Sequence, residues 1–281
     1  MKVYKTEADK LIEAIGENST YDFNQYSEKS FQRRVEKILS DYKLNIDDLI
    51  TKLHQDPVFL EEVVKNITVN TTEIFRDTAT WQILKDRILG KYIDKQVINI
   101  WHIGCSTGQE VYSTLILLNE LELFSKSEVF ATDLNTDVLN IAEKGIYKFR
   151  EIDEFIESYN KVMCSNPLEN QSNKEVHHEK YFIINRKKNL IIIKPPLIGK
   201  PIFIKHDIVK QGNIFDRKFD IIFCRNVLIY FNHELQNKLF EFFHDNLNDD
   251  GILIIGRHEG MLGEIASKYK KDESIYAKRL I

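Results

Sequence analysis

The sequence predicts an α/β fold: an open, doubly wound sheet in its larger part, a small all-helical domain before it, and a small β insertion within it. Three observations support this class. Strand-like β-branched runs alternate with helical periods from about residue 91 onward. Residues 1–67 show helical periods only. A turn-rich stretch at about 150–200 holds two short apolar runs around a polar turn.

The N-terminal domain is predicted from apolar stripes at residues 11–15, 31–42 and 49–53. A further helix begins at Asp56, which suits an N-cap, with Pro57 in the first helical position. We therefore expect a helical domain over 1–67, a linker and first helix over 68–90, and the sheet domain over 91–281.

The first strand, loop and helix of the sheet domain lie within residues 97–112, VINIWHIGCSTGQEVY. The apolar run ends at Gly104, a small polar loop reaches Gly108, and helical spacing follows at Val111, Leu115 and Leu118. In an open α/β sheet, this junction places a helix N-terminus beside the crevice where nucleotide-like ligands bind.

Later elements continue the alternation. A strand over 129–132 ends at Asp133, whose spacing from the glycine loop suits an acceptor for ribose hydroxyls. A helix over 136–144 should end at Gly145. Residues 181–184 and 190–193 predict a hairpin, and buried strands are expected at 202–208, 219–224 and 252–255, with a last, edge strand at 276–281.

Composition excludes several classes. The chain has 281 residues, 43% hydrophobic and 29% charged, with a net charge of -4, which does not favour nucleic acid as a partner. Its three cysteines form no CxxC pair, which argues against a disulfide framework or a metal site and for a reducing, cytoplasmic compartment. No apolar run approaches membrane-spanning length, so direct membrane insertion is not expected.

The loop GCSTG is neither the dinucleotide fingerprint GxGxxG nor a P-loop, because it lacks the third glycine and the Lys-Ser/Thr pair. Two glycines still let the backbone approach a ligand closely, and Glu110 offers a carboxylate in the first helical turn. The loop alone supports a nucleoside-type ligand. A second candidate surface joins Arg33, Arg34 and Lys37 on one helical face, which is either a solvated face or a docking site for an acidic helical partner.

The motifs VNTTEIFRD, HIGCSTGQEVYS, FATDLNTDVLNIAEKGIY, FDIIFCRNVLIYF and GRHEGML, in this order, closely resemble the CheR-type chemotaxis receptor methyltransferases. QYSEKSFQRRVEKIL and LHQDP are similar to that family's helical domain. The resemblance spans nearly the whole chain and is weakest over 150–200. Departures are Ile74 in place of an aromatic residue, Gln109 in place of an acid, and GRHEG in place of GHSE.

The resemblance implies a Rossmann-like methyltransferase dependent on S-adenosylmethionine (SAM), acting on glutamate side chains of the helical cytoplasmic domain of chemoreceptors in bacterial chemotaxis signalling. The enzyme is expected to be a monomer, and the β insertion corresponds to the family's receptor-tethering subdomain. Arg33, Arg34 and Lys37 would then bind the receptor. Carried over by motif, Arg76 and Tyr230 are the catalytic residues, and the cofactor-binding residues are Asn70, Thr72, Arg76, Gly104, Gly108, Glu110, Asp133, Asp207, Ile208, Arg225 and Asn226.

The chemistry needs no general base, because a glutamate carboxylate has a pKa of about 4.3 and is ionised at neutral pH. Arg76 and Tyr230 are therefore expected to orient the acceptor and exclude water, with no metal or nucleophilic side chain. Two other classes stay open: a SAM-dependent methyltransferase of another protein or a small molecule, and a non-catalytic SAM-binding or receptor-binding module. The second would usually have lost Arg76 or Tyr230, and both residues are present.

Overall fold

The computed structural model describes residues 2–149, 152–164 and 176–279, and the chain divides into two compact units. One unit comprises Met1–Val69 and Val227–Glu241, and the other comprises Asn70–Asn226 and Phe242–Ile281. Among the described residues, no helix is both long enough and apolar enough to cross a membrane.

The first unit contains the four helices that the apolar stripes predict: α1 (Lys5–Asn18), α2 (Glu28–Tyr42), α3 (Ile46–Gln55) and α4 (Pro57–Ile67). The predicted cap at α4 is confirmed, because the Asp56 carboxylate accepts hydrogen bonds from the backbone N–H groups of Val58 and Phe59. The inward faces of the four helices form the core of this unit, with buried Leu11, Phe31, Val35, Leu49 and Val63.

The second unit is built on a seven-stranded sheet of order β6-β2-β1-β7-β8-β10-β9, in which the first five strands run parallel. The expected α/β class is therefore confirmed. The strands are β1 (Ile98–Ile103), β2 (Ser127–Asp133), β6 (Ile202–Lys205), β7 (Phe219–Cys224), β8 (Leu247–Ile255), β9 (Tyr269–Asp272) and β10 (Ile275–Lys278).

Two strand predictions are wrong in detail. The last strand, β10, does not form the edge, because Glu273 and Ser274 turn the chain between β9 and β10 and leave β9 outermost. β9 carries little apolar signal, since three of its four side chains are exposed. The strand expected over 202–208 ends at Lys205, after which the chain turns.

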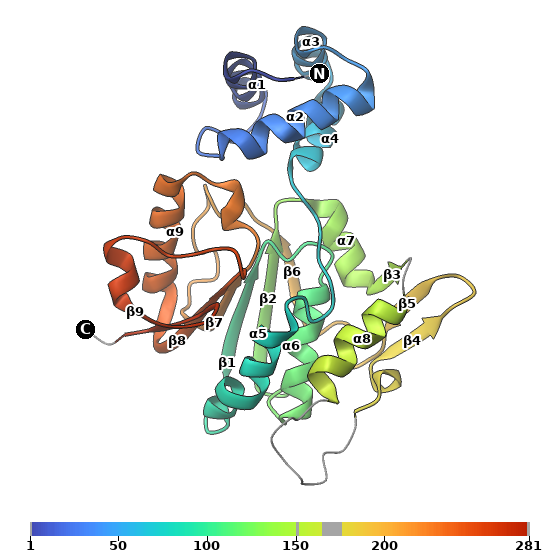
Figure 1. Ribbon diagram of the computed structural model, residues 1–281, viewed down its shortest axis with the longest axis vertical. Helices are drawn as coiled ribbons and strands as arrows, with labels where there is room; N and C mark the ends of the chain where they lie inside the picture. Colours follow the sequence, from blue (N-terminus) through green and yellow to red (C-terminus); the bar gives the residue numbers. More distant parts are fainter. Residues whose placement is uncertain (1, 150–151, 165–175, 280–281) are drawn as a thin grey trace. The chain divides into compact units, whose positions relative to one another are not determined.

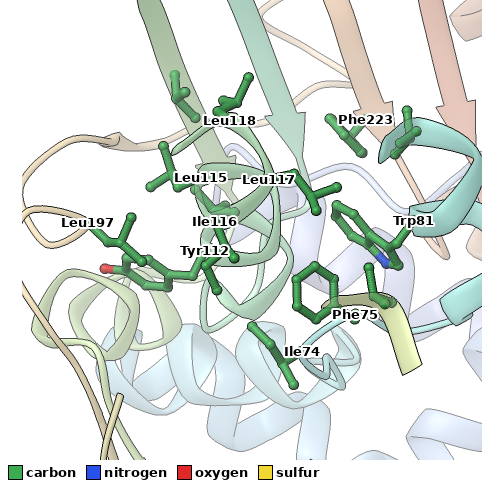
Figure 2. Packing of buried hydrophobic residues seen from close by; sticks show 14 of the residues in the cluster. Ile74, Phe75, Trp81, Tyr112, Leu115, Ile116, Leu117, Leu118, Leu197 and Phe223 are labelled. Atoms are coloured by element: carbon green, nitrogen blue, oxygen red, sulfur yellow. The ribbon is translucent and has the colours of Figure 1, made fainter. Parts of the chain in front are cut away.

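Helices α5 and α6 lie over one face of the seven-stranded sheet, and α8 lies beside α5 and the small sheet (Figure 1). Trp81 and Phe223 stack there with their ring centroids 5.8 Å apart, and Figure 2 shows Phe75 and the apolar residues of α6 beside them. The helices of this part are α5 (Thr78–Ile83), a π-helical turn (Leu84–Ile88), a 3-10 turn (Leu89–Tyr92), α6 (Gln109–Glu120), α7 (Thr136–Lys144) and α8 (Ile152–Met163), and α9 (His233–Asn246) runs from one unit into the other.

A second, three-stranded antiparallel sheet of order β3-β5-β4 accounts for the predicted β insertion. Its strands are β3 (Ile146–Lys148), β4 (Phe182–Asn185) and β5 (Leu190–Ile193), so the predicted hairpin is confirmed. Strand β3 and helix α8, which packs Phe155 and Tyr159 against β4, are additional to that prediction. Residues 150–151 and 165–175 of the expected insertion lie outside the described residues.

Candidate active site

Most predicted site residues gather at the carboxyl ends of the central parallel strands. The glycine loop follows β1, Asp133 ends β2, and Arg225 follows β7. β1 lies between β2 and β7, and the chain leads from it first to β2 and β6 on one side and later to β7 and β8 on the other. The β1/β7 boundary is therefore the topological switch point, where open α/β sheets bind ligands.

The loop between β1 and α6 takes its shape from left-handed residues. The φ angle is 68° at Gly104, 51° at Ser106 and 86° at Gly108. A Cβ atom on Gly108 would lie 2.8 Å from the Cβ atom of Ala142, so this glycine permits a close approach of the loop to α7. The hydroxyl of Ser106 is buried and has no hydrogen-bond partner in the described part of the chain. The loop thus offers a tight backbone turn and a spare buried hydroxyl.

Asp133 holds this loop in place. Its Oδ2 accepts a hydrogen bond from the Ser106 N–H at 2.8 Å, and its Oδ1 accepts one from the Asn135 N–H at 2.9 Å. Burial raises the pKa of Asp133, and the backbone donors oppose that rise in part. The Leu134 N–H also contributes, and a carboxylate has about four lone-pair directions, so some acceptor capacity remains. Asp133 therefore organises the loop and keeps acceptor capacity for the predicted ribose contact.

Glu110 lies in the first turn of α6 within an ionic network. Its Oε2 accepts a hydrogen bond from Arg225 Nη1 at 3.0 Å, and its Oε1 lies 3.0 Å from His102 Nδ1. Burial raises the pKa of Glu110, but the hydrogen bond with His102 and the charge of Arg225 outweigh burial and leave that pKa lowered. An ionised carboxylate is thus fixed at the switch point.

The Arg225 guanidinium, with only 1% of its side chain exposed, joins this network to the segment before α5. Its Nη2 donates to Asp77 Oδ2 at 2.8 Å and to the backbone carbonyl of Arg76 at 2.9 Å. Phe75 anchors the same segment, because its N–H donates to Ser113 of α6 and its ring packs against Trp81. Arg76 is therefore held near Glu110, with its own Nη1 donating to the Thr71 carbonyl at 3.2 Å.

The loops after β7 and β8 meet through one carboxylate. Glu259 Oε2 accepts the Asn226 N–H at 2.9 Å and the Gly256 N–H at 2.6 Å. Asn226 has a φ angle of 60°, and a Cβ atom on Gly256 would lie 2.8 Å from the side-chain nitrogen Nδ2 of Asn226. The GRHEG departure thus retains a glutamate that shapes the backbone around Asn226.

The other predicted cofactor residues flank this centre. Asp207 and Ile208 follow β6 in a turn that begins where the His206 N–H donates to the carbonyl of Asp133. The Asp207 carboxylate itself accepts the Val209 N–H at 2.9 Å. Asn70 and Thr72 are half-buried in the segment that leads to Arg76.

Tyr230 and the basic face belong to the first unit. Tyr230 ends a 3-10 turn (Leu228–Tyr230), and its backbone carbonyl accepts the Ser27 N–H at 2.8 Å. Arg33 and Lys37 are exposed on α2, whereas Arg34 is half-buried. Lys37 also pairs with Asp41 at 2.5 Å, so part of its charge is neutralised locally. The roles of these residues stay predictions.

Sequence reasoning missed four residues that shape the site: Asp77, His102, Tyr147 and Glu259. His102 had a readable signal, since it is a polar residue inside an otherwise apolar strand run. Tyr147 of β3, which donates its hydroxyl to the Thr107 carbonyl at 2.8 Å, had none.

Two buried cysteines lie at the strand ends, Cys105 after β1 and Cys224 at the end of β7. Burial raises the pKa of the Cys105 and Cys224 thiols well above the ordinary value, which disfavours the reactive thiolate. Among the residues that the structure describes, no three His, Cys, Asp or Glu side chains are grouped in a way that could hold a metal ion.

The arrangement fits a nucleoside ligand that carries a positive charge. Ionised Glu110 supplies an anionic contact, Asp133 supplies free lone pairs, and Ser106 supplies an unused hydroxyl. Gly108 lets the loop pack closely against Ala142 of α7. These groups suit a ligand that carries hydroxyl groups and a positive charge.

Two family models match the chain. "CheR methyltransferase, SAM binding domain" matches residues 70–176 and 168–276, and "CheR methyltransferase, all-alpha domain" matches residues 6–68.

Similar proteins bear corresponding names. The chemotaxis protein methyltransferase of Borreliella burgdorferi is 28% identical over 283 residues, covering 96% of this chain and 93% of the relative. That of Campylobacter jejuni is 29% identical over 257 residues, covering 89% and 87%. The solved structure of PKMT2 from Rickettsia typhi in complex with AdoHcy shares 18% identity over 57% of this chain and 21% of that chain, with a TM-score of 0.32, too weak a likeness to bear on fold or function.

The family models cover both the helical unit and the sheet unit, and the SAM-binding model includes every predicted cofactor residue. The expected cofactor and enzyme class are thereby confirmed. The chain belongs to the CheR methyltransferase family and is a SAM-dependent methyltransferase of the chemotaxis type.

Proposed function

We propose that this enzyme transfers the methyl group of SAM to glutamate carboxylates on the helical cytoplasmic domain of chemoreceptors, giving glutamate methyl esters and S-adenosylhomocysteine. The observation that carries the proposal is the ionised Glu110, held by Arg225 at the switch point of a family SAM-binding domain. We infer a cytoplasmic location for the enzyme, because the receptor domain that it would methylate is cytoplasmic.

The cofactor roles follow from the geometry. Glu110 receives the methionyl ammonium group, and Asp133 accepts from the ribose hydroxyls with its remaining acceptor capacity. Gly104 and Gly108 let the loop backbone lie against the cofactor. Asp207 and Ile208 supply the adenine surroundings. The remaining contacts near the methionyl group come from Asn70, Thr72, Arg76 and Asn226.

Arg225 acts on the cofactor through Glu110, because its Nη atoms are already engaged by Glu110, Asp77 and the Arg76 carbonyl. The Arg76 guanidinium, which is half-buried and hydrogen-bonded to the Thr71 carbonyl, is then the cation that we assign to the incoming acceptor.

The methyl transfer needs positioning more than proton movement. Bound SAM supplies a methyl group on a sulfonium centre, and the acceptor carboxylate is already ionised at neutral pH. Opposite charges disappear in the transition state, so Arg76 and Tyr230 assist by orienting the acceptor and excluding water. A tight ion pair between Arg76 and the acceptor would stabilise the ground state instead.

Labelled SAM and a receptor cytoplasmic domain test the reaction. Arg76→Ala and Tyr230→Phe should lower turnover by about tenfold or more while changing cofactor affinity less, because positioning acts on the transition state. Arg87→Ala, which removes an exposed arginine of the same unit as Arg76, is the matched control. Base-labile label would identify a carboxyl ester.

Four outcomes would contradict the proposal or the residue roles within it. Base-stable label would assign another acceptor atom, and label on a small molecule alone would favour a different methyltransferase class. SAM binding without transfer to any acceptor would favour a binding module. Wild-type turnover in both variants would remove Arg76 and Tyr230 from the catalytic roles.

The receptor contact is proposed for Arg33, Arg34 and Lys37 on α2. The net charge of -4 does not attract a glutamate-rich surface, so a local basic face must steer it. Each exposed cation contributes about 0–1 kcal/mol, and together they raise the association rate. Changing all three residues to Glu should raise the KM for receptor and leave SAM affinity unchanged. The increase in KM should become smaller as the salt concentration rises.

The control is the same charge reversal elsewhere, at Lys268, Lys270 and Lys271 around β9. If both triple variants change the KM equally, the effect comes from net charge and the α2 face is only solvated. An unchanged KM for the α2 variant at low salt leads to the same conclusion.

A further inference from the structure

A buried histidine lies behind the carboxylate of the cofactor site. The His102 side chain on β1 is fully buried, and its ring stacks on Phe223 with centroids 4.2 Å apart and planes 10° apart. Nδ1 lies 3.0 Å from Glu110 Oε1, whereas Nε2 has no hydrogen-bond partner in the described part of the chain. A buried polar group costs free energy unless it is hydrogen-bonded, so the contact with Glu110 offsets the cost of burying an imidazole here.

The direction of this hydrogen bond follows from Glu110. An ionised carboxylate can only accept, so His102 Nδ1 carries the hydrogen and donates it to Oε1. The neutral tautomer with a lone pair on Nε2 fits the apolar surroundings, because a second N–H on a charged ring would be buried without an acceptor.

Glu110 is therefore held on both oxygens. His102 donates to Oε1 and Arg225 donates to Oε2, which fixes the plane of the carboxylate. Of these three side chains only Glu110 has appreciable exposure, 14% against 0% and 1%, so a ligand meets the carboxylate and not its two supports. A pre-oriented acceptor binds a cation without losing side-chain freedom at that moment.

We propose that His102 is a positioning residue, whose Nδ1–H fixes Glu110 in the orientation that receives the methionyl ammonium group of SAM. This inference rests on the proposed role of Glu110. The competing explanation is that His102 only fills space against Phe223, as a core aromatic residue would.

Three substitutions separate these explanations. His102→Phe keeps a ring on Phe223 and removes the donor. His102→Asn restores a donor, because its amide nitrogen is as many bonds from Cβ as Nδ1 is. His102→Gln places the amide nitrogen one bond farther and misaligns it with Glu110 Oε1.

Calorimetry with two probes measures the effect. S-Adenosylhomocysteine carries the ammonium group, and 5′-methylthioadenosine has the same adenosine and thioether without the amino acid. His102→Phe should raise the Kd for S-adenosylhomocysteine about tenfold and leave the Kd for methylthioadenosine within about twofold. His102→Asn should recover most of the loss, and His102→Gln should not.

Glu110→Gln supplies the reference. Weaker binding of S-adenosylhomocysteine by Glu110→Gln supports the role of Glu110, and adding His102→Phe to it should then raise the Kd no further. If Glu110→Gln binds normally, the assignment of Glu110 fails and the inference fails with it.

Two results would overturn the positioning role of His102 while leaving the role of Glu110 intact. In both, Glu110→Gln binds S-adenosylhomocysteine weakly, and His102→Phe either binds it normally or loses affinity equally for S-adenosylhomocysteine and methylthioadenosine. Additive losses in the double variant would also overturn it. Should His102→Phe not fold, the Asn and Gln variants decide, and equal affinities of these two for S-adenosylhomocysteine would refute the proposal.

Discussion

Gly108→Ala tests whether the cofactor loop depends on its close approach to α7. Gly108 has a φ angle of 86°, and an alanine there costs about 1–2 kcal/mol in backbone conformation. The added Cβ atom would lie 2.8 Å from Ala142 Cβ and 3.3 Å from Ala142 Cα, and overpacking of this kind costs about 1–3 kcal/mol. The variant should therefore lose about 2–5 kcal/mol of unfolding free energy.

Gly199→Ala is the matched control. Its φ angle is 81°, but no atom lies within 4 Å of the position that a Cβ would take. It should lose about 1–2 kcal/mol, which is the conformational cost alone. The difference between the two variants measures the contact with Ala142.

Urea unfolding followed by tryptophan fluorescence is a suitable assay, because both tryptophans of the chain, Trp81 and Trp101, lie in the sheet unit. Adding Ala142→Gly to Gly108→Ala should recover stability, less about 0.5–1 kcal/mol for a glycine in a helix. Equal losses for Gly108→Ala and Gly199→Ala, or no recovery in the double variant, would refute the packing argument.

Two further predictions concern ionisation and the cofactor loop. The pKa of Glu110 is raised by burial but lowered overall by His102 and Arg225, so its contribution to stability is present above the unfolded pKa of about 4.3 and is lost as pH falls through the lower folded value. In urea unfolding at pH 7, the unfolding free energy of the wild type should exceed that of Glu110→Gln by about 1–3 kcal/mol. This difference should disappear below about pH 4, and a difference that does not change with pH would contradict the prediction. Tyr147→Phe should cost about 0.5–1.5 kcal/mol and weaken S-adenosylhomocysteine binding in calorimetry, whereas Tyr159→Phe, whose buried hydroxyl has no partner in the described residues, should cost nothing. Equal effects of the two tyrosine substitutions would contradict the role of Tyr147.

Local features of the fold could be predicted because their causes lie within a few residues. Gly145 ends α7 in the left-handed conformation, with a φ angle of 58°, and Asp56 caps α4. The break of β1 at Gly104 likewise follows from the residues themselves. β9 could not be predicted in this way, since a short outer strand with three exposed side chains has no apolar alternation.

The sequence suggested candidate site residues but not the contacts among them. Glu110 and Arg225 were both expected as cofactor-binding residues, but their pairing depends on β7 lying beside β1. Strand order cannot be predicted from a local sequence pattern. Asp77 adopts a left-handed backbone conformation, with a φ angle of 59°. The sequence gives no sign of this turn, because the position is not a glycine. His102 faces Glu110 only because the strand alternation places it on the side of α6.

The proposed role of Glu110 links cofactor binding to the order in which the sheet forms. Arg225 meets Glu110 and Asp77 across 115 and 148 residues of sequence, and closing such long loops is entropically costly and slow. A growing chain that has reached only α6 possesses the glycine loop, but Glu110 still lacks its guanidinium partner. On the proposed role of Glu110, full affinity for the cofactor should arise only when β7 pairs with β1, and bound cofactor should then stabilise the completed sheet.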